Sequence, residues 1–127
     1  MRRAIVLFLL CFAISRADAA APPSQKFVVF FEEWSAKLDD AAQAVIGQAA
    51  AAAKTNAAPV HVEAFADPTG SKKANELLTD LRAQVVIDQL QADGVSSTRI
   101  VGRGHGSVHF ALSSQESRRV EISFGGH

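Results

Sequence analysis

The stretch from Ala64 to Ala83 reads AFADPTGSKKANELLTDLRA, and it is the part of the chain that most limits the possible fold. It begins as the end of a strand, passes through a DPTG turn at residues 67–70, and continues in a helical pattern. An acid, Asp67, is therefore expected at a strand end, and a base, Arg82, fifteen residues later near a helix start. An acid and a base held on separate rigid elements suit a ligand that carries both an amine and a carboxylate. The stretch predicts a strand–turn–helix unit with a binding site rather than a catalytic site.

The chain before this stretch predicts a strand, a helix and the strand that leads into the turn. The aromatic and β-branched run Phe27–Phe31 is typical of a strand. Asp39 suits the N-cap of a helix, and apolar residues recur at helical spacing from there to about Lys54. The segment Val60–Ala66 begins with the apolar–polar alternation of a strand.

The chain after the turn predicts a second main helix and two more strands. A short helical segment leads to Thr79, which suits the N-cap of a longer helix that ends before Gly94. Arg99–Gly102 begins a third strand, a glycine-rich loop is expected over Gly102–Gly106, and Arg119–Phe124 alternates as a fourth strand. The apolar positions of the longer helix are Leu81, Val85, Val86 and Leu90.

This order of elements, β-α-β-α-β-β, predicts a single α+β domain over residues 27–124. The expected architecture is a sandwich in which two main helices pack on one face of a mixed four-stranded sheet. Right-handed crossovers would make the first three strands parallel wherever they are neighbours. Phe30, Phe31 and Trp34 are expected in the core or at its edge.

The N-terminus has the features of a targeting segment. A basic pair precedes eleven apolar residues, Ala4–Ile14, and a small-x-small cleavage site follows at Ala17–Ala19. Eleven residues are too few to cross a bilayer core, which needs about 20. Residues 1–19 are therefore expected to be a cleaved secretory signal peptide, and residues 20–26 a short flexible leader. A lipid anchor at Cys11 is the less favoured alternative, because Leu10 stands where a lipidation site has a small residue.

Composition limits the classes of partner. The whole chain has 13 basic and 13 acidic residues, and removal of residues 1–19 leaves 10 basic and 12 acidic ones, a net charge of about −2. No overall positive field therefore attracts nucleic acid. The remaining chain has no cysteine, so packing without disulfides must supply its stability in an oxidising compartment.

Arg82 is the residue in this pattern that most strongly suggests a function. If Thr79 is the N-cap, Arg82 lies three residues into the helix, where a cation near the positive end of the helix dipole costs about 0.3–1 kcal/mol. A local conflict of this kind often marks a functional site. The ordinary alternatives are a simple Asp-Pro turn at Asp67 and a salt bridge from Arg82 to Asp67 or Asp80.

The same residues resemble a known family, the OmpA C-terminal-like (OmpA/Pal/MotB) peptidoglycan-binding domains. Domains of that family carry a strand, a T-D-x-x-G turn and the helical motif N-x-x-L-S-x-x-R-A. The segment Arg118–Ile122 resembles the family's closing R-R-V-E strand, and Phe27–Leu38 resembles its opening strand and turn. The positions that match the turn and helix motifs without a gap are Asp67, Gly70, Asn75, Leu78, Thr79 (for Ser), Arg82 and Ala83.

The resemblance implies a non-catalytic module that binds peptidoglycan through the diaminopimelate of its stem peptides. Together with the signal peptide, it implies a location in the periplasm or cell envelope. Asp67 would accept from the ammonium group of that residue, and Arg82 would pair with its carboxylate. Asn75 would fix the loop or touch the ligand, and Thr79 would cap the helix. Arg118 or Arg119 would supply a further donor, but only one of them, because adjacent strand residues face opposite sides.

Several departures from the family pattern support an alternative, a protein–protein interaction module that has lost peptidoglycan binding. The usual G-H-T-D is replaced by AFAD, so that the hydroxyl next to Asp67 and the histidine are absent. Ala74 replaces a tyrosine, Ser117 an asparagine, and Ser114 an arginine. Each loss removes a hydrogen bond worth about 0.5–1.5 kcal/mol. Envelope proteins would be the partners of such a module.

The sequence predicts no metal site, no cofactor and no catalytic residue. His105 and His109 are four residues apart, but they lie in the glycine-rich segment without acidic or cysteine neighbours in sequence. The run Gly102-x-Gly104-x-Gly106 follows a strand, but no helix with a lysine follows it, so a dinucleotide site is not expected. An enzyme is therefore the third and least favoured hypothesis.

Overall fold

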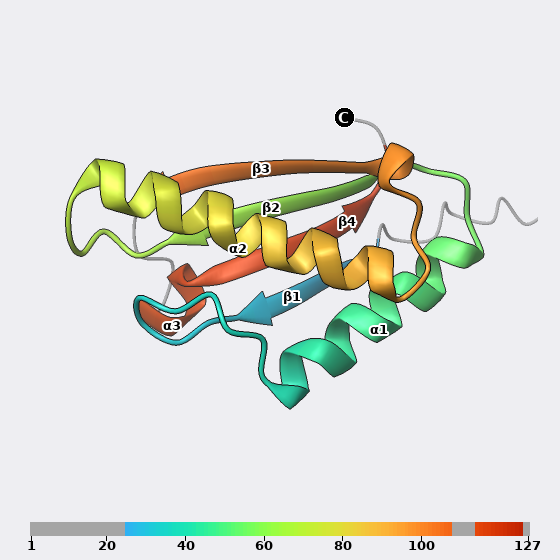
Figure 1. The fold of residues 1–127 in the computed structure, drawn as a ribbon, viewed down its shortest axis with the longest axis horizontal. Helices are drawn as coiled ribbons and strands as arrows, with labels where there is room; N and C mark the ends of the chain where they lie inside the picture. The colour runs from blue at the N-terminus through green and yellow to red at the C-terminus, as the bar shows by residue number, and fades with distance from the viewer. Residues whose placement is uncertain (1–24, 108–113, 126–127) are drawn as a thin grey trace, which may run out of the picture.

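The computed structural model describes residues 25–107 and 114–125. The strands form one four-stranded sheet, and Figure 1 shows the long helices crossing one face of it. The helices are α1 (Asp40–Lys54), α2 (Lys72–Ala92) and the single-turn α3 (Ser114–Ser117), with a short 3-10 helix at Ser97–Arg99. The strands are β1 (Lys26–Phe30), β2 (Val60–Ala66), β3 (Ile100–Ser107) and β4 (Arg119–Phe124).

The sheet is mixed and has the order β1-β4-β2-β3. Strands β2 and β3 are parallel, as expected for a right-handed crossover through α2, and β4 runs antiparallel to both β1 and β2. The predicted α+β architecture is confirmed. Since β4 lies between β1 and β2, the last strand of the chain holds the first in place, and the start of β4 lies beside the end of β2.

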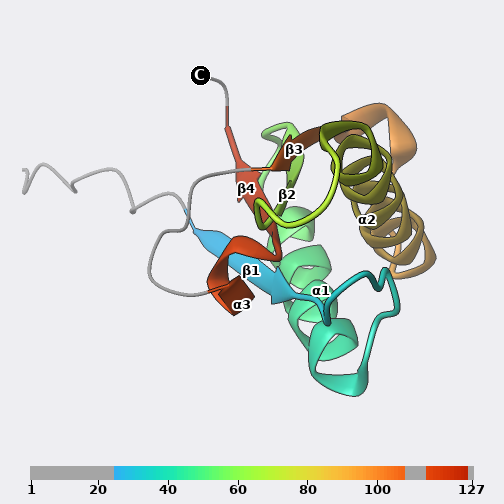
Figure 2. The ribbon, with the colours of Figure 1, turned by 90° about the vertical axis from the view of Figure 1, so that its left-hand side faces the viewer.

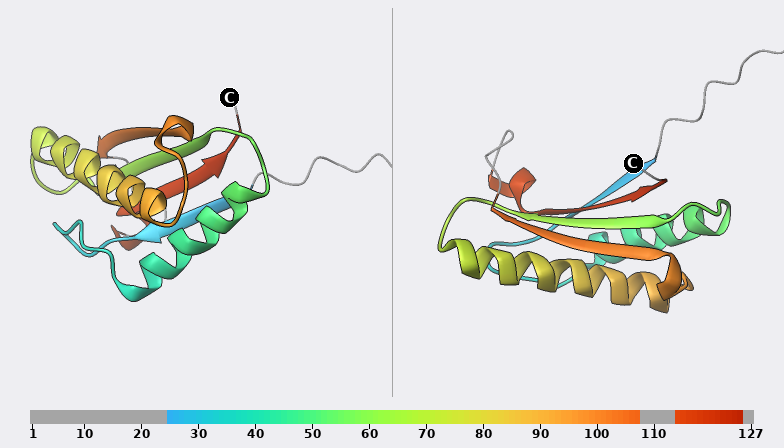
Figure 3. Two further views of the ribbon diagram at one scale, coloured as in Figure 1. Left: turned by 45° about the vertical axis from the view of Figure 1, so that its right-hand side comes forward. Right: turned by 90° about the horizontal axis from the view of Figure 1, so that it is seen from above.

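Both main helices pack on the same face of the sheet, which Figures 2 and 3 show from the end and from above. The side chains between the layers are apolar, and most of them are inaccessible to solvent. Helix α1 faces the sheet with small residues, which let its backbone approach closely. The buried side chains of this core include Val29, Ile46, Ala49, Ala53, Val60, Val62, Val86, Leu90, Val120 and Ile122.

The predicted limits of β1, α1 and β2 are close to those observed, but two of the three aromatic residues were wrongly expected in the core. Phe31 is buried, whereas Phe30 is 43% exposed and Trp34 is 51% exposed. Alternation explains the difference at Phe30, because its neighbour Val29 points into the core. Asp39 caps α1 as predicted, its Oδ1 accepting from the backbone N of Ala42 at 2.7 Å.

Helix α2 differs from its predicted start. Its N-cap is Ser71, whose hydroxyl accepts from the backbone N of Ala74 at 3.1 Å, and the helix continues unbroken through Thr79. The prediction of Thr79 as a cap was wrong because two residues of this chain suit that role, and good helix formers fill the space between them. Arg82 is therefore far inside the helix, and the predicted conflict with the helix dipole does not occur. Gly94, with φ of 102°, follows the end of the helix as predicted.

The segment expected to be a glycine-rich loop is part of β3, which makes this prediction wrong. Gly102 and Gly104 are paired with β2 in parallel register. At Gly104 an added Cβ would lie 2.8 Å from both the backbone N of Asp80 and the hydroxyl of Thr79. Glycine at this position therefore allows α2 to approach the strand closely. A sequence pattern does not indicate this role, because glycine is usually interpreted as the end of a strand.

Candidate functional site

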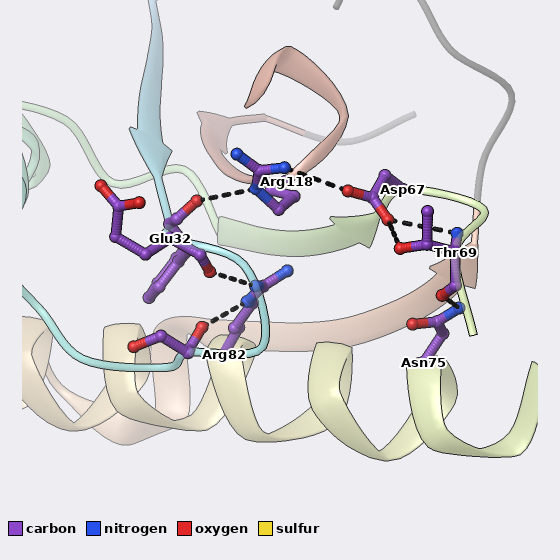
Figure 4. A network of polar contacts seen from close by, with 8 residues as sticks. Glu32, Asp67, Thr69, Asn75, Arg82 and Arg118 are labelled. Atoms are coloured by element: carbon purple, nitrogen blue, oxygen red, sulfur yellow. Dashed lines mark hydrogen bonds and ion pairs between the residues drawn. The ribbon is translucent and has the colours of Figure 1, made fainter. Parts of the chain in front are cut away.

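Four segments that are distant in sequence meet at one end of the molecule, the end that Figure 2 views. They are the loop after β1, the turn after β2, the first half of α2 and the residues just before β4. The two central strands bring them together, because β2 ends and β4 begins at this edge of the sheet. Four of the polar side chains singled out from the sequence lie here, namely Asp67, Asn75, Arg82 and Arg118 (Figure 4).

Asp67 directly follows β2 and is 5% exposed. Its Oδ1 accepts from the backbone N of Thr69 at 3.2 Å and also from the hydroxyl of Thr69. Its Oδ2 accepts from Nη1 of Arg118 at 3.1 Å. Burial raises the pKa of this carboxyl, but the hydrogen bonds from Thr69 and the charge of Arg118 outweigh it and leave the pKa below its ordinary value. Asp67 is therefore a carboxylate at neutral pH.

Arg118 and Arg119 point to opposite sides of the sheet, as the alternation of strand residues requires. The guanidinium of Arg118 reaches the site, where its Nε donates to the carbonyl of Phe31 at 3.2 Å in addition to the bond with Asp67. That of Arg119 lies on the other face, 4.3 Å from the ring centroid of Phe65. The sequence left open which arginine would join the site, and the structure brings Arg118 to it.

Arg82 is fully buried, with 0% of its surface exposed. Its Nε donates to the carbonyl of Ser35 at 2.8 Å and its Nη2 to the carbonyl of Glu32 at 2.9 Å (Figure 4). The guanidinium carbon lies 5.1 Å from the ring centroid of Phe31. Within residues 25–107 and 114–125, Arg82 forms no salt bridge with an acidic side chain, so the sequence-based alternative of a pair with Asp67 or Asp80 does not apply.

The third nitrogen of this guanidinium, Nη1 of Arg82, is buried and has no hydrogen-bond partner among the described residues. Desolvation and, to a lesser extent, the nearby charge of Arg118 lower the pKa of Arg82 to about 10, and the charge of Asp67 partly opposes this shift. Arg82 therefore remains a cation at neutral pH. The site thus holds a buried positive charge with unused donor capacity, which favours an anion.

Asn75 and Thr79 stabilise the frame around the site. The amide of Asn75 donates to the carbonyl of Thr69 at 2.8 Å and to the hydroxyl of Ser107 at 2.6 Å, which ties the turn after β2 to the end of β3. The hydroxyl of Thr79 accepts from the backbone N of Gly106 at 2.9 Å and donates to the carbonyl of Glu76. Thr79 thus connects α2 to β3 from the middle of the helix.

A small pocket with an empty volume of about 170 Å³ lies between these side chains. Of the residues predicted from the sequence, Asp67, Asn75, Arg82 and Arg118 line it, while Thr79 and Arg119 do not. Its remaining lining residues are Glu33, Trp34, Ala66, Thr69 and Leu78. Neither Trp34 nor the carbonyls of the loop after β1 were among the site residues predicted from the sequence.

The hydroxyl of Thr69 was also missed, although the sequence contained a signal for it. Ala66, directly before Asp67, has no hydroxyl, and Thr69 supplies one to Asp67 from two residues further on. Asp-x-Thr in a turn is a spacing at which the carboxylate accepts from both the backbone and the side chain of the Thr. No group of three or more His, Cys, Asp or Glu side chains suited to a metal ion occurs in the described part of the chain, and His109 lies outside it.

A comparison with known families gives the site its context, since a model described as the OmpA family matches residues 30–121. The chain belongs to the OmpA family. It is 40% identical over 96 residues to outer membrane protein 40 of Porphyromonas gingivalis, a match that covers 75% of this chain and 25% of that protein. The chain therefore spans about a quarter of the length of this curated relative.

Solved structures of other bacterial proteins share the fold. The peptidoglycan-associated lipoprotein from Burkholderia pseudomallei superposes with a TM-score of 0.70 at 23% identity, over 76% of this chain and 88% of that one. The cell wall anchor of the T6SS from Pseudomonas aeruginosa superposes with a TM-score of 0.63 at 26% identity, over 80% of this chain and 82% of that one. Domains of the OmpA family are non-catalytic binding modules, and this chain belongs to that family. No helix within the described ranges is both long and apolar enough to span a bilayer.

Proposed function

We propose that this OmpA-family domain binds peptidoglycan by holding the free amino-acid head of diaminopimelate between Asp67 and Arg82. The observation that carries this proposal is the buried Nη1 of Arg82, which has no partner among the described residues and belongs to a side chain lining the same pocket as Asp67. A diaminopimelate residue linked through one of its two amino-acid centres still offers an ammonium and a carboxylate at the other. The site offers one charged group for each.

The carboxylate of the ligand would bind to Arg82. Two of the nitrogens of this guanidinium donate to the carbonyls of Ser35 and Glu32, so its orientation is fixed before any ligand arrives. A buried cation without a counter-charge is costly, and a ligand carboxylate would both neutralise it and use the remaining donor. Preorganised donors of this kind bind carboxylates well because little side-chain freedom is lost on binding.

The ammonium group of the ligand would bind to Asp67. This carboxylate is ionised at neutral pH, and the hydrogen bonds from Thr69 and Arg118 hold both of its oxygens in place. Each carboxylate oxygen can accept more than one hydrogen bond, so these contacts leave room for an ammonium donor. Arg118 would keep Asp67 oriented, and Asn75 would keep the turn that carries it against β3.

The setting that we propose for this activity is the periplasm, reached through a cleaved signal peptide at residues 1–19. Residues 1–24 lie outside the part of the chain that the structure describes, so this rests on the sequence pattern alone. Residues 27–124 would then be the folded binding module, with residues 20–26 as its leader.

Co-sedimentation of the purified protein with peptidoglycan sacculi tests the proposal. Wild type should pellet with the sacculi, and Asp67→Asn and Arg118→Ala should remain largely in the supernatant. Arg119→Ala is the matched control, because it removes the same charge one residue away on the opposite face of the sheet and should pellet like wild type. Urea unfolding of each variant separates lost binding from lost folding. Equal pelleting of all four proteins would contradict the proposal.

A second function, binding of an envelope protein, is favoured by two exposed leucines on α2. Leu77 and Leu81 are 61% and 53% exposed and lie one turn apart on the side of the helix that faces away from the sheet. If wild type stays in the supernatant, this becomes the leading hypothesis, and Leu77→Ser and Leu81→Ser become the informative variants.

A further inference from the structure

Trp34 has an unusual conformation above the pocket. It is the residue other than glycine with a positive φ in the described chain, at 53°, a value that bulky residues rarely adopt. Its ring lies against the backbone of Gly70, where an added Cβ would clash with the ring carbons Cη2 and Cζ2. The indole therefore connects the loop after β1 to the turn that carries Asp67, and it lines the pocket between them.

The pocket is too small for the ligand in this arrangement. Its empty volume is only about 170 Å³ even with the open solvent at its mouth included, so little room is left between the lining side chains. Binding must therefore enlarge it, and the lining side chains differ in how easily they can move. Asp67, Asn75, Arg82 and Arg118 are each fixed by two or more hydrogen bonds. The indole of Trp34 makes no hydrogen bond among the described residues and is half exposed.

From these contacts we propose that Trp34 is a lid on the Asp67–Arg82 pocket, which a diaminopimelate head displaces when it binds. This inference rests on the proposed function. Backbone strain at Trp34 favours movement of this residue, since a non-glycine residue at positive φ persists only while its surroundings hold it there. The contact between the indole and Gly70 holds it in place, and the ligand would replace that contact. Trp34 lines the same pocket as the buried cation Arg82. A ligand that displaces the indole must therefore compensate for the lost contact, which the paired charges of an amino-acid head can do.

Intrinsic fluorescence reports the lid directly, because the full chain has one tryptophan and no tyrosine. Purified protein is titrated with a muropeptide that contains meso-diaminopimelate, and binding is measured in parallel by calorimetry. The emission of Trp34 should change saturably, with the same midpoint as the calorimetric isotherm. Asp67→Asn should lose both signals together.

A substitution of Trp34 distinguishes a lid from a side chain that lines the pocket without limiting access to it. Trp34→Asn removes the indole and tolerates a positive φ, so the pocket should be open in the free protein. If the open state of wild type is populated at about 10% or less, this variant should bind about tenfold or more tightly. Leu77→Asn removes an exposed apolar side chain outside the pocket and should leave the affinity unchanged.

Two results would overturn the inference, and they differ in what they say about the proposed function. Calorimetric binding by wild type without a change in emission, or with no gain in affinity in Trp34→Asn, would refute the lid and leave the diaminopimelate site intact. Absence of any binding, in both calorimetry and sacculus sedimentation, would refute the proposed function and the lid with it.

Discussion

Substitution of Gly104 by alanine should destabilise the fold, because helix α2 lies too close to β3 for a methyl group. The added Cβ would lie 2.8 Å from the backbone N of Asp80 and 2.8 Å from the hydroxyl of Thr79. A helix backbone cannot yield as a side-chain end does, so the helix must move away from the strand. That movement would also stretch the 2.9 Å bond between the backbone N of Gly106 and the hydroxyl of Thr79.

The expected decrease in the free energy of unfolding of Gly104→Ala follows from three contributions. Overpacking of this kind costs about 1–3 kcal/mol. Loss of the Thr79 hydrogen bond adds about 0.5–1.5 kcal/mol. Replacement of glycine lowers the conformational entropy of the unfolded chain, which raises the free energy of unfolding by about 0.4–1 kcal/mol. The free energy of unfolding should therefore fall by about 0.5–4 kcal/mol. Each kcal/mol lost lowers the Tm by about 4–8 °C in a domain of this size.

Gly102→Ala is the matched control, since it makes the same change two residues away in the same strand. Its added Cβ would meet the side-chain end of Ile87 at 2.5 Å, and that end can rotate away. Urea unfolding followed by circular dichroism should show a clear decrease in midpoint for Gly104→Ala and little change for Gly102→Ala. Equal midpoints for the two variants would refute the argument that α2 requires glycine at position 104.

Three further changes have expected outcomes. Gly47→Ala, in α1 with no atom within 4 Å of the added Cβ, should raise the free energy of unfolding by about 0.5–1 kcal/mol in urea titrations. Asp39→Ala removes the N-cap of α1 and should lower it by about 1 kcal/mol, seen as a lower Tm in calorimetry. The folded-state pKa of Asp67 is depressed, so its contribution to stability is present above the ordinary value of 3.8 and is lost as the pH falls through the lower folded value. The difference in unfolding free energy between wild type and Asp67→Asn, measured by urea titration, should therefore be smaller at pH 3 than at pH 5. A difference that stays constant would mean that the carboxylate is not stabilised in the fold.

The architecture could be predicted from the sequence because its signals are local. The alternation in Val60–Ala66 and Arg119–Phe124, and the cap at Asp39, each specify an element within a few residues. Strand β3 was missed beyond Gly102 because its glycines have no β preference of their own. Their role lies in the packing of α2 against the strand, which is a property of two distant segments.

The candidate site could be predicted in part. The residues Asp67, Asn75 and Arg82 were found through their spacing and their resemblance to a family motif, and the structure brings them to one pocket. Their partners were not foreseen, since Arg82 is held by backbone carbonyls of Glu32 and Ser35, which carry no side-chain signature. The helix start was misplaced for a similar reason, because the face that includes Asn75, Thr79 and Arg82 is polar yet buried, while leucines of the same helix are exposed.

The recognition of a free amino-acid head by Asp67 and Arg82 is tested most directly by changing the ligand. Two stem tripeptides that end in meso-diaminopimelate are compared by calorimetry, one with a free side-chain carboxylate and one with that carboxylate converted to a carboxamide. A hydrogen bond to a charged group contributes about 1.5–3 kcal/mol, so amidation should weaken binding by about tenfold or more. Equal affinity for the two peptides, or binding of neither, would contradict the account.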